Sequence, residues 1–353
     1  MTGLPSVVLL ALFLTSGGAI WAAGVKLSDY TDVLAQRLHL GAALGGVVLL
    51  AVATNLPEIA ITVSASVSGH VEVAVSNILG GIAIQTVVLA VVDAAGVRPR
   101  QPLTYVAASL VLVLEALLVI AVLVVTIMGT QLPARLILAR TTPAVLLIAA
   151  VWLIGLFLVN RAGRGLSWTE RGEAPNGQQH PRGHAEKAKE SAAREKGVST
   201  RRAVTVFGAA GLVTLAAGVL IEPSREAFFG RVGMSGVIFG ATVLAAATAL
   251  PELSTGLTSA RLGDFKLAMG DIFGGNAFLP VLFLLATLVS GKAVLPAAGR
   301  SDIYLTALGG LLTTVYAAGL LFRPQRQIAR MGVDSLTVVV LYVIGMAGLI
   351  ALP

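Results

Sequence analysis

Long apolar runs alternate with short polar segments over almost the whole chain. A helix of about 20 apolar residues is long enough to cross the hydrocarbon core of a bilayer. The second and third runs, and the seventh and eighth, are separated only by tight turns at Gly69 and Gly263. The pattern predicts an all-α integral membrane protein with ten transmembrane helices, at 4–23, 41–67, 71–92, 103–128, 141–159, 203–222, 233–260, 265–290, 302–322 and 334–352.

These runs divide the chain into two halves of five, 1–159 and 203–353, joined by the segment 160–202. That segment is rich in Arg, Lys, Glu, Gly, Gln and Ala and has almost no large apolar residue. It cannot bury enough apolar surface to offset its chain entropy, so we expect a disordered or loosely helical linker. The linker either tethers the halves or acts as a regulatory, partner-binding segment, and the tether is the simpler interpretation.

Composition agrees with a membrane protein. Of 353 residues 56% are hydrophobic and only 12% are charged, against roughly 25% charged in a soluble domain. The absence of cysteine excludes disulfides, thiolate metal sites and a cysteine nucleophile. The net charge of +7 does not indicate nucleic-acid binding, because the basic residues lie in loops and no basic face with interleaved aromatics occurs. The first apolar run has no Lys or Arg before it, so we interpret it as a span rather than a secretory signal.

The basic residues also predict an orientation. Of the 25 lysines and arginines, 19 fall on the side that holds the linker and six on the other side. Basic loops are retained in the cytoplasm. We therefore expect the linker in the cytoplasm and both termini outside, in a plasma membrane of bacterial type.

One short stretch occurs twice. Ala53-Thr54-Asn55-Leu56-Pro57-Glu58 recurs 194 residues later as Ala247-Thr248-Ala249-Leu250-Pro251-Glu252. At the same offset Gly80-Gly81 matches Gly274-Gly275. Because each half has an odd number of spans, the two copies enter the membrane in opposite directions. Many secondary transporters are built from inverted repeats of this kind, with the substrate site between them near mid-membrane.

The repeated stretch predicts a cation site. Glu58 and Glu252 lie inside spans, where a charge costs roughly 3 kcal/mol unless it faces a partner or a wet cavity. No Lys or Arg lies near them within a span, so we expect protons or a bound cation as the partner. Calcium takes 6–8 oxygen ligands. Pro57 and Pro251 break the helix and free backbone carbonyls, and the predicted ligands are Glu58, Glu252, Thr54, Thr248 and the carbonyls of Ala53 and Ala247. The alternative is that proline kinks a span and glutamate bonds a neighbouring helix.

The next span of each copy adds further polar groups. Asn77 and Asp271 occupy equivalent positions, and Gln85 and Asn276 lie beyond them. We include all four as candidate cation ligands. Amides between helices also serve as plain interhelical contacts, and for Gln85 this alternative stands equally.

With these motifs the chain resembles the calcium/cation antiporter superfamily, which includes sodium/calcium and proton/calcium exchangers. The resemblance covers the ten-span plan, the repeat and the linker. It implies that Glu58 and Glu252 are the central cation ligands, assisted by Thr54 and Thr248.

The chain departs from the sodium/calcium exchangers of that family at several positions. The resemblance implies serine at 55, 81, 249 and 275, and Asn or Asp at 85 and 279. Here these positions are Asn55, Gly81, Ala249, Gly275, Gln85 and Leu279. Asp271 lies about two helical turns before Leu279 and cannot take its place. The missing ligands favour proton coupling, or another cation selectivity, over full sodium coupling.

Glu115 is a further carboxylate in the middle of the fourth apolar run, and its counterpart is Gly309. It is either a proton site coupled to exchange or a protonated group that bonds a neighbouring helix. Other polar residues at span ends are expected to be interfacial caps that water reaches, namely His39, Asp93, Glu222 and Asp302.

The sequence thus predicts a secondary active antiporter and no enzyme. We expect it to export Ca²⁺ in exchange for H⁺ or Na⁺, with small cations and the bilayer as partners and without a cofactor. The first alternative is a monovalent cation/proton antiporter, and a less favoured one is a cation channel. An aspartyl protease is excluded because Asp264 and Asp271 lie on one segment rather than on facing helices.

Overall fold

The computed structural model describes residues 5–37, 55–97, 101–167, 199–232, 245–261 and 263–351. Almost all secondary structure in these ranges is helical. The first half contains α1 (Ser6–Arg37), α3 (Leu56–Val67), α4 (Val71–Gly96), α5 (Leu103–Ala107), α6 (Leu110–Thr130) and α7 (Pro143–Arg164). The second half contains α9 (Thr200–Val232), α11 (Ala245–Thr248), α12 (Leu250–Arg261), α13 (Phe265–Phe278), η2 (Leu279–Val281), α14 (Leu282–Ser290), η3 (Leu295–Ala297), α15 (Arg300–Phe322) and α16 (Val333–Ile350).

Seven described helical segments are long and apolar enough to cross a membrane, and α3 is a shorter apolar helix. The chain is therefore an integral membrane protein. The predicted runs 41–67 and 233–260 fall only partly within the described residues, and α9 is not among the seven. Ten spans and the inverted orientation of the halves stay predictions. Most of the predicted linker, 168–198, lies outside the described residues, although α7 continues to Arg164 and α9 begins at Thr200.

The repeat is visible in the element bounds. Adding the 194-residue offset to Leu56–Val67 gives 250–261, the bounds of α12. The same offset takes α4 to 265–290, which is the extent of α13, η2 and α14 together. The second copy of this helix is interrupted because Pro280, which replaces Thr86, has no amide hydrogen for a helical bond. The local sequence pattern therefore recurs as local structure.

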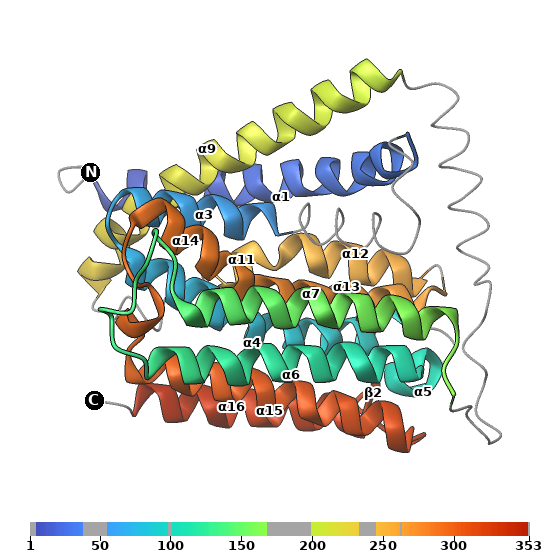
Figure 1. Cartoon of the computed structure of the whole chain (residues 1–353). Coiled ribbons are helices and arrows are strands. Elements are labelled where there is room, and N and C mark those ends of the chain that lie inside the picture. Colours follow the sequence, from blue (N-terminus) through green and yellow to red (C-terminus); the bar gives the residue numbers. More distant parts are fainter. Residues whose placement is uncertain are drawn as a thin grey trace.

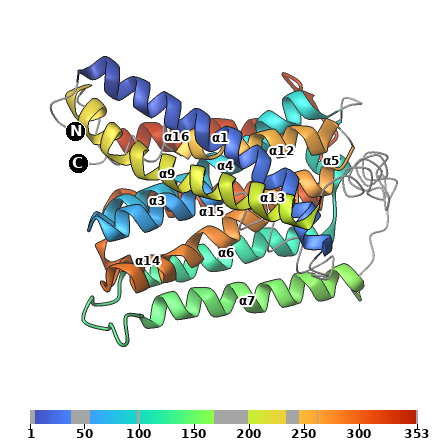
Figure 2. The same ribbon diagram turned by 90° about the horizontal axis from the view of Figure 1, so that it is seen from above.

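Helix α4 lies at the centre of the bundle. It packs against α3, α12, α13, α15 and α16, and nearly three quarters of its span is buried. Helices α6 and α7 pack side by side on one flank, and α1 lies against α9, the first described helix of the second half (Figures 1 and 2). A central helix in contact with both halves is well placed to carry residues shared between the two copies.

Two departures from the predicted helices are local. The run 103–128 is broken at Ala108 and Ser109, and Ser109 caps α6 by accepting a bond from the amide of Val111. A hairpin, β1 (Gln327–Ile328) and β2 (Met331–Gly332), precedes α16. Its two turn residues both have positive φ, as tight hairpin turns require. The all-α fold class is confirmed, and this two-stranded hairpin is a local addition to it.

Helices α4 and α12 cross closely at Gly96, and this contact gives a stability prediction. A Cβ on Gly96 would lie 2.8 Å from the Cβ of Ala260, and both atoms are fixed to helix backbones. Gly96→Ala must therefore push the helices apart, at a cost of about 1–3 kcal/mol. We expect a lower midpoint of thermal unfolding in detergent.

Gly208→Ala is the matched control, because a Cβ there meets nothing within 4 Å. Alanine in an exposed helix interior is neutral or stabilising by up to about 1 kcal/mol. Equal unfolding midpoints for the two variants would contradict the close crossing.

Candidate functional site

The first copy of the repeated stretch begins a helix. Asn55 is the N-cap of α3, and Pro57 and Glu58 lie in its first turn, where a missing proline amide costs nothing. The Glu58 side chain is fully buried. It lies at the helix end that carries a partial positive charge, which favours an anionic group there.

The second copy has the same design. Helix α11 ends at Thr248 and α12 begins at Leu250, so the interruption at Ala249 directly precedes Pro251 and Glu252. Glu252 is 1% exposed. The Thr248 hydroxyl donates to the carbonyl of Ala245 at 3.2 Å and lies beside the carboxylate of Glu58 from the other half. Residues 53 and 54 lie outside the described residues, as does the side chain of Ala247.

The two glutamates meet at one amide. The Nε2 of Gln85 on α4 lies 3.5 Å from Oε1 of Glu58 and 3.4 Å from Oε1 of Glu252. These are long, weak hydrogen bonds. The Oε2 atoms of both glutamates and the Oε1 of Gln85 are buried without a hydrogen-bond partner in the described part of the chain. A buried oxygen without a donor is costly, so this arrangement suits an added cation or proton.

A second amide occupies the space beside Gly275. A Cβ on Gly275 would lie 3.2 Å from Nδ2 of Asn55 and 3.8 Å from Oε1 of Gln85. At the equivalent position in the other copy, a Cβ on Gly81 would instead meet the side chain of Leu279 at 3.7 Å. The two copies are therefore unequal around the glutamates, polar beside Gly275 and apolar beside Gly81.

Gly275→Ala tests this packing. The added methyl group would press on the Asn55 amide, so we expect cation affinity to fall about fivefold, equivalent to roughly 1 kcal/mol. Binding of ⁴⁵Ca²⁺ to the purified protein measures it. Gly208→Ala is the control, because its Cβ meets nothing within 4 Å and it lies in α9, outside the site. A loss of affinity in Gly208→Ala as large as in Gly275→Ala would contradict the assignment.

Asp271 and Thr255 extend the site along the second half. The Thr255 hydroxyl donates to Oδ2 of Asp271 at 2.8 Å, and the charges of Asp271 and Glu58 both act on Glu252. Asn276 donates to the Thr86 hydroxyl at 3.1 Å, which ties α13 to α4. Asn77 is fully buried, and neither of its side-chain polar atoms has a hydrogen-bond partner among the described residues.

The donor set suits a hard cation. The described ranges contain no group of three or more His, Asp or Glu side chains gathered for a metal. Within them, neither Glu58 nor Glu252 forms an ion pair. Two carboxylates with neutral hydroxyl, amide and carbonyl oxygens match the ligand type that Ca²⁺ prefers. Protons can also bind these two carboxylates, and they then compete with the cation for the same oxygens.

Two other predicted positions are more buried than expected. Asp93 is 2% exposed and accepts from the amides of Leu103 at 2.8 Å and Gly332 at 2.7 Å. Asp302 is 3% exposed; it caps the start of α15 through Gly299 and accepts from the Ser76 hydroxyl at 2.7 Å. The expectation that water reaches these two aspartates is wrong, because loops and neighbouring helices cover them.

Glu115 lies five residues after the start of α6 rather than in the middle of a continuous span, because the break at Ser109 shortens that helix. The structure does not place it with Glu58 and Glu252. His39 and the side chain of Glu222 lie outside the described residues.

Sequence reasoning missed Thr255 and Thr86 as partners of Asp271 and Asn276. It also treated Asn55 only as a lost serine, whereas its amide reaches the space beside Gly275. The sequence did contain a signal for Asn55. Asparagine at 55 is larger, and glycine at 275 smaller, than the serine that the resemblance implies at each position. Thr255 follows Glu252 by three residues and so lies on a neighbouring part of the same helix face.

Comparisons with known proteins agree with this architecture. The family described as sodium/calcium exchanger protein matches residues 8–168 and 202–351. The putative antiporter CaxA of Alkalimonas amylolytica is 29% identical over 311 residues, covering 87% of this chain and 89% of CaxA. The inner membrane protein YrbG of Escherichia coli K12 is 26% identical over 279 residues, covering 77% of each chain.

Solved structures share the fold. The H⁺/Ca²⁺ exchanger CAX matches with a TM-score of 0.67 and 15% identity, over 98% of this chain and 82% of CAX. The YfkE structure matches with a TM-score of 0.64 and 15% identity, over 99% of this chain and 93% of YfkE. The sodium-calcium exchanger NCX_Mj matches with a TM-score of 0.58 and 14% identity, over 97% of this chain and 99% of that one.

Proposed function

Because the chain belongs to the sodium/calcium exchanger protein family, we propose that it exports Ca²⁺ from the cytoplasm by antiport at the site formed by Glu58 and Glu252. The family membership indicated by the repeated motif is confirmed, and this family consists of transporters rather than enzymes. The observation that carries the proposal is the shared contact of both glutamates with Gln85, with one buried oxygen of each left without a partner.

Charge balance explains why such a site exchanges ions. Two carboxylates without a protein cation are neutralised by one divalent ion, two monovalent ions or two protons. The site is unstable when both carboxylates are ionised and no cation is bound, because an uncompensated buried charge costs several kcal/mol. The empty, doubly charged site cannot turn to the other side of the membrane until an ion binds, and this requirement couples the movements of the two ions. With the halves inverted, the site opens to each side in turn.

We favour protons as the coupling ion. Leu279 stands where Gln85 stands in the first copy, and its side chain is fully buried. It offers no oxygen, so one half supplies fewer ligands for the several ions of a sodium-driven exchanger. A carboxylate accepts a proton without any further ligand.

The same shortage of ligands supports a second candidate, a monovalent cation/proton antiporter. The described residues gather no third acidic side chain with Glu58 and Glu252 around one metal position. Such a site is weaker for Ca²⁺ than a three-carboxylate site, and Na⁺ or K⁺ needs less charge. Ca²⁺ remains the first candidate because two buried carboxylates balance its charge alone.

The proposed orientation places the linker in the cytoplasm and both termini outside the bacterial-type plasma membrane. It rests on the excess of lysine and arginine on the linker side. In this orientation export from the cytoplasm appears as uptake into everted vesicles.

Everted vesicles test the function and the coupling ion together. We expect ⁴⁵Ca²⁺ uptake when the vesicle interior is acidified, and loss of uptake when a protonophore collapses the pH gradient. Uptake driven only by a sodium-loaded interior would identify Na⁺ instead. Movement of Na⁺ or K⁺ without any Ca²⁺ uptake would establish the second candidate. An ohmic current that needs no counter-ion would contradict antiport.

A further inference from the structure

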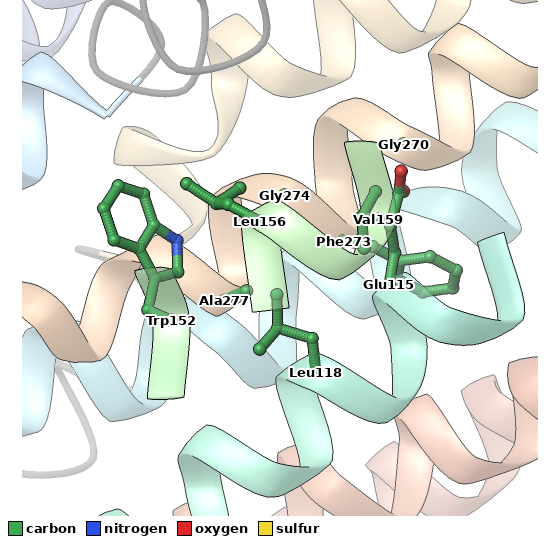
Figure 3. Close-up of a pocket in the computed structure, with 9 residues that line it drawn as sticks. All are labelled: Glu115, Leu118, Trp152, Leu156, Val159, Gly270, Phe273, Gly274 and Ala277. Atoms are coloured by element: carbon green, nitrogen blue, oxygen red, sulfur yellow. The ribbon is translucent and has the colours of Figure 1, made fainter. Parts of the chain in front are cut away.

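A cavity of about 30 Å³ lies between α6, α7 and α13, away from the two central glutamates. Glu115 is the one acidic residue that lines it, among apolar side chains and two glycines (Figure 3). Its volume is enough for at least one water molecule. The lining consists of Glu115, Leu118, Trp152, Leu156, Val159, Gly270, Phe273, Gly274 and Ala277.

The carboxylate of Glu115 points towards Gly270 on α13 (Figure 3). Its Oε2 atom would lie 3.3 Å from a Cβ at Gly270, so a side chain at this position would crowd the carboxylate. This Oε2 atom is buried and has no hydrogen-bond partner in the described part of the chain. An unpaired carboxylate in such surroundings is costly, and a bound proton removes the charge.

No neighbouring charge neutralises Glu115. Within the described ranges it forms no hydrogen bond or ion pair. Among the described helices, those that pack most against α6 and carry charged or titratable groups are α7, α13 and α15. They bring Arg161, Arg164, Lys266, Asp271, Arg300, Asp302, Tyr304 and Tyr316. Of these, Asp271 directly follows Gly270, the glycine that the Glu115 carboxylate faces, and it is a second acidic group.

Asp271 connects this position to the central site. It accepts the Thr255 hydroxyl of α12 at 2.8 Å, and its charge acts on Glu252. Gly270 and Asp271 of α13 therefore lie between the Glu115 carboxylate and α12, the helix that carries Glu252. A cation bound at Glu252 also attracts negative charge, and so favours loss of a proton from Glu115.

We propose that Glu115 is a second proton-binding site, which releases its proton into the water of this cavity when the central site binds its cation. The proposal rests on the proposed function. The proton leaves as hydronium, and no bond other than the carboxyl O–H is broken. By linkage, the same coupling makes cation binding tighter when Glu115 is ionised.

Proton counting on the purified full-length protein tests the coupling. Ca²⁺ binding is measured by calorimetry in buffers of different ionisation enthalpy, which gives the protons released per Ca²⁺ bound. We expect Glu115→Gln to bind Ca²⁺ and to release fewer protons than the unaltered protein, by up to one. Glu115→Asp, which keeps a carboxyl group, should restore part of the release.

Glu72→Gln is the matched control, because Glu72 is exposed at the start of α4 and should leave the proton count unchanged. An equal proton count for Glu115→Gln and the unaltered protein would overturn the proposal. Elution as a single species in gel filtration shows that each variant is folded.

A second measurement separates this proposal from the proposed function. The infrared carbonyl stretch of protonated carboxyl groups is recorded between acid and alkaline pH without added cation. A band that disappears in Glu115→Gln supports proton binding at Glu115 even if the protein binds no Ca²⁺. An unchanged spectrum in that variant contradicts it.

Discussion

Replacing Glu58 or Glu252 by glutamine is expected to lower Ca²⁺ exchange by at least about a hundredfold. Glutamine keeps the size and one oxygen but removes a buried negative charge that the cation neutralises. Removing one partner of a buried charge interaction costs about 3–5 kcal/mol, and each 1.4 kcal/mol is tenfold in affinity. Because both glutamates face Gln85, loss of either should affect the site to a similar degree.

The measurement is initial ⁴⁵Ca²⁺ uptake in everted vesicles, normalised to the amount of protein in the membrane. Glu72→Gln makes the same chemical change at an exposed position and should transport at the unaltered rate. If either Glu58→Gln or Glu252→Gln transports as fast as this control, the two-glutamate site is wrong.

Gln85→Leu is expected to weaken cation binding about tenfold. Leucine is the residue at the equivalent position 279, so its shape is already accommodated in the other copy. The change removes an amide that both glutamates contact, together with a buried oxygen that has no partner among the described residues. Hydrogen bonds to charged groups contribute about 1.5–3 kcal/mol to binding or stability. We use the lower value because the two hydrogen bonds of Gln85 to the glutamates are long.

Equilibrium binding of ⁴⁵Ca²⁺ to the purified variant gives the change in affinity. Gln131→Leu is the control, since Gln131 is exposed at the end of α6. Gln85→Leu also makes the two halves alike at this position, so unaltered affinity would show that Gln85 only connects helices.

Much of the local architecture was predictable from the sequence. The bounds of α3 and α12, and of α4 and its interrupted counterpart, follow the 194-residue repeat of apolar runs, glycines and prolines. These features act locally, because a proline or a glycine ends a helix wherever its neighbours lie. The pairing of an unusual proline and carboxylate twice over likewise pointed to Glu58 and Glu252.

The surroundings of the glutamates were less predictable. Gln85 was ranked equally as a ligand and as a plain contact, and Asn55 was noted only as a departure. Their amides gather beside Gly275 because α3, α4 and α13 pack with particular rotations about their axes. A rotation of a few tens of degrees turns a side chain from one neighbour to another, and the apolar pattern does not specify helix rotation that finely.

Burial at the helix ends was also misjudged. Asp93 and Asp302 lie near the ends of apolar runs, where sequence alone suggests contact with water. In the fold, the hairpin before α16 supplies the Gly332 amide to Asp93, and α4 supplies the Ser76 hydroxyl to Asp302. These partners lie more than 200 residues away along the chain, so no local pattern could indicate them.

The sequence by itself determined an integral membrane protein with a repeated helix plan and two carboxylates inside apolar runs. It did so because hydrophobic length, helix-breaking residues and misplaced charges are properties of short segments. Only the tertiary structure decided that Gln85 contacts both glutamates, that Thr255 holds Asp271, and that Glu115 lines a separate cavity against Gly270. Those contacts depend on how distant helices cross and rotate, which is settled by the packing of all their side chains at once.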